Sequence, residues 1–163
     1  MQVHMIRAAM VAACQEMNRT GLYQGTSGNL SVRVEKSMLI TPTATPYDQL
    51  APDMMTAMQI ADEEGRFLGP RAPSSEWRFH RDIYRARGDV GAIVHAHAPY
   101  ATALSMLRKN LPAAHYMIAA FNTHEIICTD YAPYGTAELS ALAVAGLGAA
   151  HAVLLGSHGM IAT

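Results

Sequence analysis

Residues 92–99 read Ala92-Ile93-Val94-His95-Ala96-His97-Ala98-Pro99, and this stretch decides the fold class. Residues 92–97 have the pattern of a buried strand, and Pro99 is a favoured first residue of a helix. The same alternation continues in both directions along the chain. Strands are expected at 30–34, 38–41, 58–60, 125–129 and 152–156, and helices at 4–19, from Ser74-Ser75-Glu76 onward, at 99–109 and at 136–149. This order predicts an α/β layered domain, and the hairpin-like early strands favour a mixed sheet over an all-parallel one.

The composition limits the classes of function. A chain of 163 residues can form one domain with a real core and is too short for two ordinary ones. Charged residues make up 15% of the chain, against roughly 25% in an average soluble domain. The deficit suggests surface buried between subunits, although a core rich in Ala and Met is the alternative. With a net charge of −1 and no run of Lys or Arg, neither nucleic acid nor an anionic membrane is an expected partner.

Cysteine usage and hydropathy favour a cytoplasmic protein. Cys14 and Cys128 form no CxxC motif and no disulfide framework, which fits a reducing compartment. The longest apolar stretch, 141–156, falls short of the roughly 20 residues that span a bilayer, and glycines interrupt it. No signal peptide is visible at the N-terminus.

Three histidines and one acid are candidates for a metal site. His95 and His97 lie two apart on the expected strand, so both side chains project from one face. His158 follows another expected strand, where sites in α/β sheets tend to lie. A catalytic zinc usually takes three protein ligands. Glu76 is either a first-turn acid that complements the helix dipole, or a carboxylate that serves as ligand or general base.

Each of these histidines has an ordinary alternative. A lone His-x-His is more often two unrelated residues with backbone hydrogen bonds, and His158 alone reads as a turn residue. The remaining histidines have no matching geometry and are interpreted as structural: His4, His80, His115, His124 and His151.

Two short segments have the chemistry of an anion cradle. Gly25-Thr26-Ser27-Gly28-Asn29 and Ser74-Ser75 offer small side chains, exposed backbone N–H groups and hydroxyls, and the second opens a helix. Taken singly, each is an ordinary turn or cap. No Walker lysine and no GxGxxG motif follows a strand, so nucleotide binding is not indicated.

Several ordered blocks together resemble the class II aldolase/adducin family, in particular its sugar-phosphate aldolases. The blocks are Gly-Leu-x-Gln-Gly-Thr-x-Gly-Asn at 21–29, Leu-Ile-Thr-Pro-Thr at 39–43, Pro-Ser-Ser-Glu-Trp-Arg-Phe-His at 73–80, Val-His-x-His at 94–97, His-Tyr-Met-Ile-Ala-Ala at 115–120 and His-Gly at 158–159. The resemblance runs through nearly the whole chain.

The resemblance implies a fold, an assembly and a set of roles. The fold would be a three-layer α/β/α domain around a central mixed, largely antiparallel sheet, and the protein a homotetramer with a Zn²⁺ site at each subunit interface. His95, His97 and His158 would bind the zinc, with Glu76 as the fourth ligand at rest and the catalytic base once substrate displaces it. The substrate phosphate would be held by Gly28, Asn29, Thr43, Ser74 and Ser75. Tyr116, from the neighbouring subunit, would be the proton donor to the aldehyde oxygen.

The implied reaction is reversible cleavage of a ketose 1-phosphate to dihydroxyacetone phosphate and an aldehyde. The sugar would be L-fuculose 1-phosphate or a 5-deoxy or methylthio pentulose 1-phosphate. Alternatives within the family are a methylthioribulose-1-phosphate dehydratase and a sugar-phosphate 4-epimerase, although the epimerase typically has Asp where this chain has Glu76. A non-catalytic adducin-like interaction domain is a third alternative, but it is expected to lack the ligand set.

The sequence departs from the family at two kinds of place. Ala44 replaces a usual glycine beside Thr43, residues 121–124 replace a Gly-rich segment, and Tyr134 stands where phenylalanine is found, so the aldehyde substrate is open. The chain also stops at Thr163, where relatives continue through further helices. We therefore expect one domain over 1–163 that lacks the C-terminal helices, with apolar surface exposed or covered by a partner, and with reduced activity.

Overall fold

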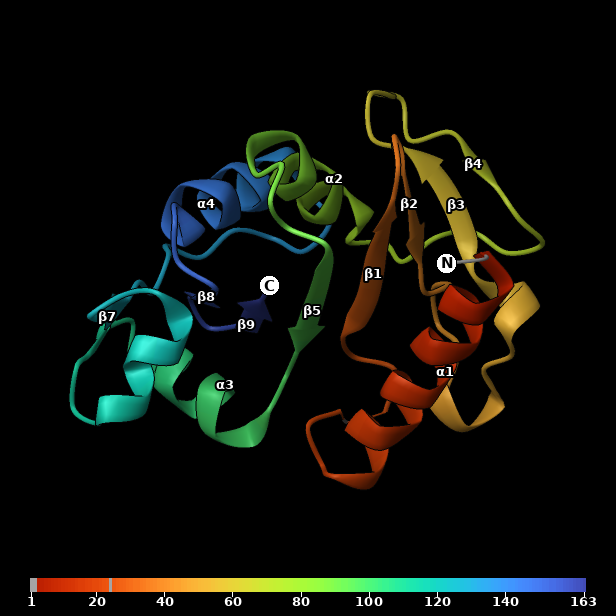
Figure 1. Ribbon diagram of the computed structural model, residues 1–163. Coiled ribbons are helices and arrows are strands. Elements are labelled where there is room, and N and C mark those ends of the chain that lie inside the picture. The colour runs from red at the N-terminus through yellow and green to blue at the C-terminus, as the bar shows by residue number, and fades with distance from the viewer. Residues whose placement is uncertain (1–2, 24) are drawn as a thin grey trace.

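The computed structural model describes residues 3–23 and 25–163 (Figure 1). The helices are α1 (Val3–Arg19), α2 (Trp77–Ala86), α3 (Pro99–Met106) and α4 (Ala137–Leu147), with short 3-10 helices η1 (Tyr47–Gln49), η2 (Pro52–Met54) and η3 (Tyr116–Phe121). The strands are β1 (Asn29–Val34), β2 (Ser37–Ile40), β3 (Thr56–Gln59), β4 (Phe67–Leu68), β5 (Ala92–Ala96), β6 (Leu111–Pro112), β7 (Glu125–Ile126), β8 (Ala152–Leu155) and β9 (Gly159–Ala162).

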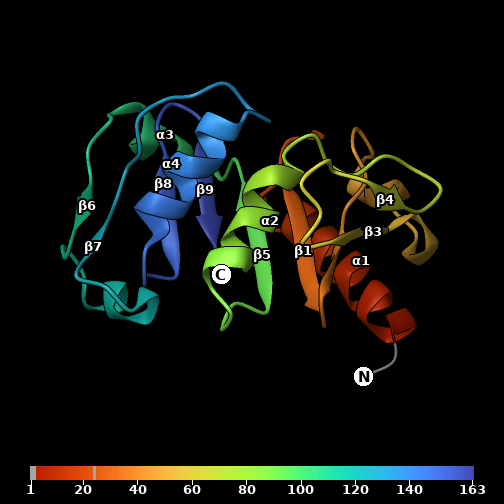
Figure 2. The same ribbon diagram turned by 90° about the horizontal axis from the view of Figure 1, so that it is seen from above.

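The centre of the fold is a seven-stranded sheet in the order β4-β3-β2-β1-β5-β9-β8. Each pair of neighbouring strands in it is antiparallel. The prediction of a largely antiparallel central sheet is confirmed, and among the described residues its parallel component is an isolated bridge between Cys128 and Leu154. β6 and β7 form a separate pair at the end of the molecule opposite α1 (Figure 2).

Helices cover both faces of this sheet, as the three-layer prediction requires. On one face, Ile93 of β5 packs in a core with residues of α2 and α4, which lie side by side (Figure 1). On the other face, Val94 and Ala96 pack in a core with Met10 of α1, and α3 contacts β8 and β9. Because side chains alternate along a strand, His95 shares the face of Ile93 and lies on the α2 side.

The start of α2 differs from the sequence prediction. The expected serine cap is absent, and Trp77 is the first helical residue. Ser74 instead forms a turn, in which its carbonyl accepts from Trp77 N at 3.0 Å and its hydroxyl from Glu76 N at 3.3 Å. Glu76 therefore occupies the N-cap position without capping the helix, and its carboxylate is directed elsewhere.

The other helix prediction with a cap is confirmed. Thr136 is the N-cap of α4, and its hydroxyl accepts from Leu139 N at 3.1 Å. The helix ends at Leu147, two residues before the predicted end, because Gly148 takes φ +50° as its C-cap.

Several short elements were not predicted. β4 and β6, with two residues each, are too short for a periodic pattern, and β9 and η3 were not predicted either. The predicted strand 125–129 ends at Ile126, and Thr129 N donates to Leu154 O beyond it. β9 returns beside β8 after a tight turn in which Ser157 has φ +56°.

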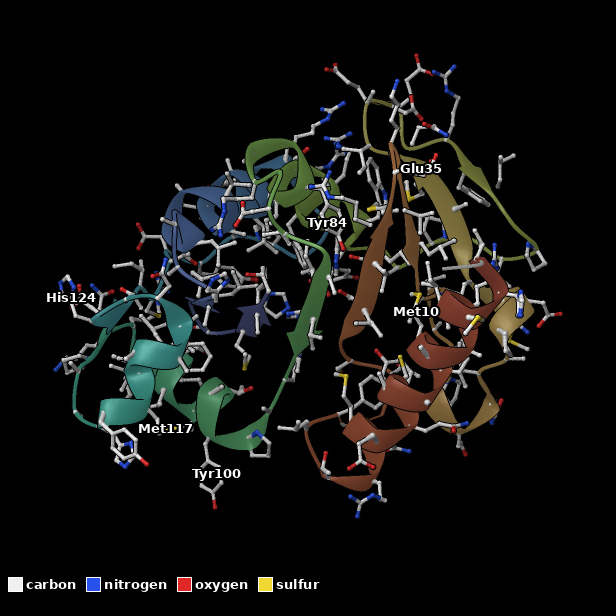
Figure 3. The ribbon with its side chains drawn as sticks, viewed as in Figure 1. Met10, Glu35, Tyr84, Tyr100, Met117 and His124 are labelled. Carbon is white, nitrogen blue, oxygen red and sulfur yellow. The ribbon has the colours of Figure 1, made fainter. Side chains whose placement is uncertain are left out.

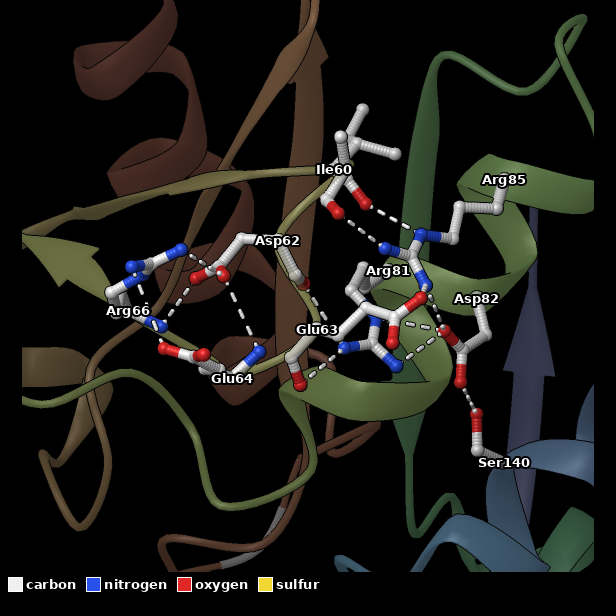
Figure 4. A network of polar contacts seen from close by, with 10 residues as sticks. Ile60, Asp62, Glu63, Glu64, Arg66, Arg81, Asp82, Arg85 and Ser140 are labelled. Atoms are coloured by element: carbon white, nitrogen blue, oxygen red, sulfur yellow. Dashed lines mark hydrogen bonds and ion pairs between the residues drawn. The ribbon is translucent and has the colours of Figure 1, made fainter.

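A polar network fixes α2 against its neighbours (Figure 4). Arg81, only 5% exposed, donates to the carbonyls of Asp62 and Glu63 at 3.1 Å each and pairs with Asp82 at 2.7 Å. Ser140 of α4 donates to the other oxygen of Asp82 at 2.6 Å. The helix that follows Glu76 is thereby tied both to the loop after β3 and to α4. Within the described residues, no helix is long and apolar enough to cross a bilayer.

Candidate metal centre and phosphate cavity

The fold brings the three candidate histidines together. His95 is on β5, His97 follows that strand, and His158 lies in the turn between β8 and β9. Their ring centroids are 5.0 Å apart for His95 and His97, and 4.9 Å for each pair with His158. One nitrogen from each lies within 4.8 Å of the others. Antiparallel pairing of β5 with β9 creates this proximity, because it places His158 beside the end of β5.

Glu76 completes the cluster. Its Oε2 lies 3.2 Å from His95 Nε2 and its Oε1 lies 3.3 Å from His158 Nε2. The side chain is buried, and Oε1 has no hydrogen-bond partner of good geometry. A buried carboxylate oxygen without a partner is costly unless a cation or donor satisfies it.

These distances fit a metal ion. Two ligand atoms on a tetrahedral zinc ion, each about 2.05 Å from it, lie about 3.3 Å apart. Nε2 of His95 and Nε2 of His97 are 3.1 Å apart, the two Glu76 contacts are 3.2 and 3.3 Å, and the ligand nitrogens of the three histidines lie within 4.8 Å of one another. A donor set of three imidazoles and one carboxylate is typical of zinc.

A backbone contact orients His95 for this role. Its Nδ1 lies 2.9 Å from the carbonyl oxygen of Met160. Because a carbonyl only accepts, Nδ1 donates to Met160, and Nε2 is the ring nitrogen that faces the cluster. Metal-binding histidines are commonly fixed in this way.

Burial and mutual charge set the protonation of the cluster. Burial, followed by the charge of His95, lowers the pKa of His158 to about 4 and also lowers the pKa of His97. Burial raises the pKa of Glu76, but the hydrogen bond and charge of His95, with the charge of His158 and the amide of Asn29, bring it to about 2. At neutral pH, His97 and His158 are therefore neutral and Glu76 is ionised, which are the metal-binding forms.

A cavity of about 360 Å³ opens beside this cluster. Its wall contains all five candidate phosphate residues together with Glu76, His97 and His158. The lining is Thr26, Ser27, Gly28, Asn29, Pro42, Thr43, Ala44, Ser74, Ser75, Glu76, His97, Tyr131, Ala132, Tyr134, Ser157 and His158. The positive end of the α2 dipole and several hydroxyls thus face the same space as the metal candidates.

Two glycines allow the close approach of chain segments at the site. Gly28 has φ +103°, and a Cβ there would lie 2.7 Å from the carbonyl oxygen of His95. A Cβ on Gly159 would lie 2.7 Å from Ala96 O and 3.1 Å from the His97 ring. The cradle at Gly28 and the turn after His158 therefore both require glycine, which has no side chain.

Ala44 has a conformation that the sequence left open. Its φ is +48°, so the cradle requires the left-handed region that glycine adopts more easily. The departure from the family's glycine is therefore accommodated at some cost in backbone strain.

Tyr116 is the one candidate that lies away from the cluster. It belongs to η3, is 79% exposed and is not among the residues of the cavity wall. Its role as proton donor stays a prediction, as do the ligand and phosphate roles of the other candidates.

The sequence missed several residues of the site. Tyr131 and Ser157 line the cavity, and His80 lies directly behind Asn29. Tyr134 was already noted in the sequence as a departure from the family, and its proximity in sequence was a signal for Tyr131, three residues earlier. No local pattern marks Ser157, because its place depends on the turn before β9.

Comparison with known proteins shows the family of the chain. Residues 8–163 match the Class II Aldolase and Adducin N-terminal domain. The chain therefore belongs to the class II aldolase and adducin family, and the named relatives are aldolases.

Two curated relatives are similar over almost the whole chain. The 5-methylthioribulose-1-phosphate/5-deoxyribulose-1-phosphate aldolase of Rhodospirillum rubrum is 46% identical, over 97% of this chain and 70% of the relative. The L-fuculose phosphate aldolase of Escherichia coli (strain K12) is 44% identical, over 99% of this chain and 74% of the relative. The prediction that the family's C-terminal helices are missing from this domain stays a prediction.

Solved structures share the fold. An L-fuculose 1-phosphate aldolase matches with a TM-score of 0.90 and 38% identity, over 96% of this chain and 73% of that one. The L-fuculose-1-phosphate aldolase of Thermus thermophilus matches with a TM-score of 0.80 and 28% identity, over 95% of this chain and 76% of that one.

Proposed function

We propose that this protein is a zinc-dependent aldolase that reversibly cleaves a ketose 1-phosphate to dihydroxyacetone phosphate and an aldehyde. The observation that carries the proposal is the shared cavity, whose wall joins the histidine and Glu76 cluster to the small, hydroxyl-rich segments around Gly28 and Ser74. A metal ion held by His95, His97, His158 and Glu76 supplies a Lewis acid that stabilises negative charge on the substrate oxygens.

The protein's own residues would position the substrate and move protons. Backbone N–H groups and hydroxyls of Gly28, Asn29, Thr43, Ser74 and Ser75 hold the phosphate at the start of α2, where the helix dipole favours an anion. In cleavage, the Tyr116 phenolate of a neighbouring subunit would take the proton of the C4 hydroxyl as the C3–C4 bond breaks. The protonated Glu76 carboxyl would then give its proton to C3, and one proton passing through solvent from the Tyr116 phenol to the Glu76 carboxylate would restore both groups. In condensation both transfers reverse.

The proposed substrate class rests on the names of the relatives and on two tyrosines in the cavity wall. The two curated relatives act, by name, on L-fuculose phosphate and on methylthio- or deoxy-pentulose 1-phosphates. Tyr131 and Tyr134, 55% and 71% exposed, lie in the cavity wall. We assign them to the aldehyde end, where an apolar methyl or methylthio group suits an aromatic wall.

We further propose a cytoplasmic homotetramer with interfacial sites. Exposed apolar side chains on α3, η3 and the segments around them support an interface. They include Tyr100, Met106, Leu107, Tyr116 and Met117, and Tyr100 and Met117 extend outward in Figure 3. Tyr116 would reach a cavity only across such an interface. Cys14 and Cys128 are free thiols, which fits a reducing cytoplasm.

Metal and product analysis test the proposed function. Purified protein is expected to contain close to one zinc per chain and to release dihydroxyacetone phosphate from at least one of L-fuculose, 5-deoxyribulose and 5-methylthioribulose 1-phosphate. Formation of a dehydrated ketone instead would assign a dehydratase. If the protein takes up no metal on titration and turns over no ketose 1-phosphate, the proposed aldolase function is excluded.

Mixing two inactive variants tests the shared site. Glu76→Gln and Tyr116→Phe remove groups that the proposal places on different subunits of one site. Reassembled mixtures are expected to regain a fraction of wild-type activity, because hybrid oligomers contain some intact sites. Mixtures as inactive as each parent, in oligomers shown by mass spectrometry to be hybrid, would contradict a Tyr116 contribution across the interface.

A further inference from the structure

A chain of buried hydrogen bonds lies directly behind Glu76. Asn29 Nδ2 donates to Glu76 Oε2 at 3.0 Å, and Asn29 Oδ1 contacts His80 Nε2. His80 Nδ1 lies 2.7 Å from Ser31 Oγ, which lies 3.0 Å from the Tyr84 hydroxyl. All five side chains are at least nine-tenths buried, and Tyr84 extends from α2 toward β1 (Figure 3).

The Glu76 carboxylate fixes the donor and acceptor direction of these hydrogen bonds. A carboxylate only accepts, so the amide nitrogen of Asn29 must face Glu76 and the amide oxygen must face His80. The oxygen needs a donor, which places the His80 proton on Nε2. Nδ1 of His80 then accepts from the Ser31 hydroxyl, whose oxygen accepts from Tyr84. Burial, with the charge of His95, lowers the pKa of His80 to about 3 against the opposing charge of Glu76, so His80 has a single ring proton at neutral pH.

The reversed arrangement is unfavourable. If His80 carried its proton on Nδ1, Nε2 would need the Asn29 amide nitrogen as donor. The amide oxygen would then face the Glu76 carboxylate, and two acceptors would be opposed in a buried place. His80 and Glu76 therefore select the same Asn29 orientation from opposite ends.

We propose that His80 is a positioning residue, which acts through the Asn29 amide to hold the Glu76 carboxylate against the histidine cluster. Asn29 is suited to this link because it pairs with His95 across β1 and β5 and also lines the cavity. The consequence for the metal site rests on the proposed function, whereas the direction of the hydrogen bonds does not.

A matched pair of substitutions separates the N–H group of His80 from its bulk. His80→Gln keeps an amide N–H that can donate to Asn29 Oδ1, and His80→Leu removes it while filling much of the space. His151→Gln is the control, since His151 contacts Thr163 Oγ1 and is not in the cavity wall. Zinc affinity, measured by competition with a chromophoric chelator, is expected to fall about 10- to 100-fold in His80→Leu. It should stay within about threefold of wild type in His80→Gln and His151→Gln.

Kinetics give a second readout. In His80→Leu, kcat is expected to fall about tenfold or more with KM nearly unchanged, because the carboxylate is misplaced while the phosphate cradle remains. His80→Gln should restore most of kcat. Equal losses in the Gln and Leu variants, or zinc affinity unchanged in both, would show that His80 only fills space and would overturn the proposal.

The tautomer of His80 is a test that needs neither metal nor turnover. Long-range ¹H–¹⁵N NMR of the metal-free wild-type protein is expected to show His80 as the neutral Nε2–H form, and a Nδ1–H form would overturn the proposal. If the protein neither binds zinc nor cleaves a ketose 1-phosphate, the proposed function fails while this measurement still decides the hydrogen-bond chain. The measurement also remains decisive if His80→Leu does not fold.

Discussion

Glu76 is an acid whose surroundings keep it ionised although it is buried. Its carboxylate lies between His95 and His158, and Asn29 donates to it from behind. A group in this position can bind a cation or move a proton, and it lies in the wall of the cavity. Both roles are lost when the carboxylate becomes an amide of the same shape.

We expect Glu76→Gln to lower the rate of ketose 1-phosphate cleavage by about 10²- to 10⁴-fold, the range attributed to general acid–base catalysis. Release of dihydroxyacetone phosphate at saturating zinc measures the effect. Glu63→Gln is the control, because the Glu63 side chain is 84% exposed and makes only a long contact to Arg85. If folded Glu76→Gln protein keeps more than a third of the wild-type rate, Glu76 has no catalytic role.

Ala44 tests the strain of the cradle. Its φ of +48° costs an alanine roughly 1 kcal/mol, whereas the extra freedom of glycine in the unfolded chain costs about 0.4–1 kcal/mol. Ala44→Gly should therefore leave the free energy of unfolding unchanged or raise it by up to about 1 kcal/mol. Ala44→Val should lower it by more than about 1 kcal/mol, because a β-branched residue fits this region poorly.

The matched control for Ala44 is Ala51→Gly. Ala51 has φ −118°, so glycine relieves no strain there and should destabilise by about 0.4–1 kcal/mol. Urea unfolding of the metal-free proteins measures all three variants. If both glycine substitutions destabilise equally, the left-handed conformation at Ala44 carries no strain.

At the scale of elements, α4 depends on a cap beside the cavity. The Thr136 hydroxyl accepts from Leu139 N. Thr136 follows Gly135, where an added Cβ would lie 2.9 Å from the carbonyl oxygen of Ser75. Thr136→Ala should lower the free energy of unfolding by about 1 kcal/mol, and Thr136→Ser should change it little, since serine keeps the hydroxyl. Urea unfolding checks both, and an equal loss in both would mean that the threonine methyl group, not the cap, stabilises α4.

Local patterns predicted the elements whose signals are local. The spacing of Ile6, Met10 and Met17 predicted α1, and all three are buried. Thr136 marked the start of α4. The two serines before Glu76 were interpreted as a cap and are not, because Ser74 is held in a turn, with its N–H donating to Thr41 O at 2.9 Å. That contact joins residues 33 positions apart, so no window around Ser74 contains it.

The site shows the same limit more sharply. Strand periodicity placed His95 and His97 on one face, but the approach of His158 depends on the antiparallel register that sets Met160 opposite Ala96. The resemblance to a family supplied that convergence, and local spacing did not. His80 was interpreted as structural, since only the pairing of β1 with β5 and the packing of α2 bring it behind Asn29.

At the scale of the whole molecule, buried groups that stay neutral link stability to pH. The unfolded chain protonates His80 near its ordinary pKa of about 6.5, whereas in the folded protein that pKa is about 3, because burial and the charge of His95 outweigh the charge of Glu76. Between these values the unfolded state binds more protons than the native state. The contribution of His80 to stability is therefore fully present above about pH 6.5 and is lost as the pH falls toward 3.

We expect this linkage to separate wild type from His80→Gln, which has no titrating ring. The wild-type advantage in free energy of unfolding should shrink as the pH is lowered from about 7.5 to about 4.5, with a limiting slope of about 1.4 kcal/mol per pH unit. Urea unfolding of the metal-free proteins across this range measures it. His97 and His158 titrate in both proteins, so their contributions cancel in the difference. If the difference in free energy of unfolding between the two proteins stays constant with pH, His80 is protonated equally in the folded and unfolded states. That result would contradict a neutral His80 in the hydrogen-bond chain behind Glu76.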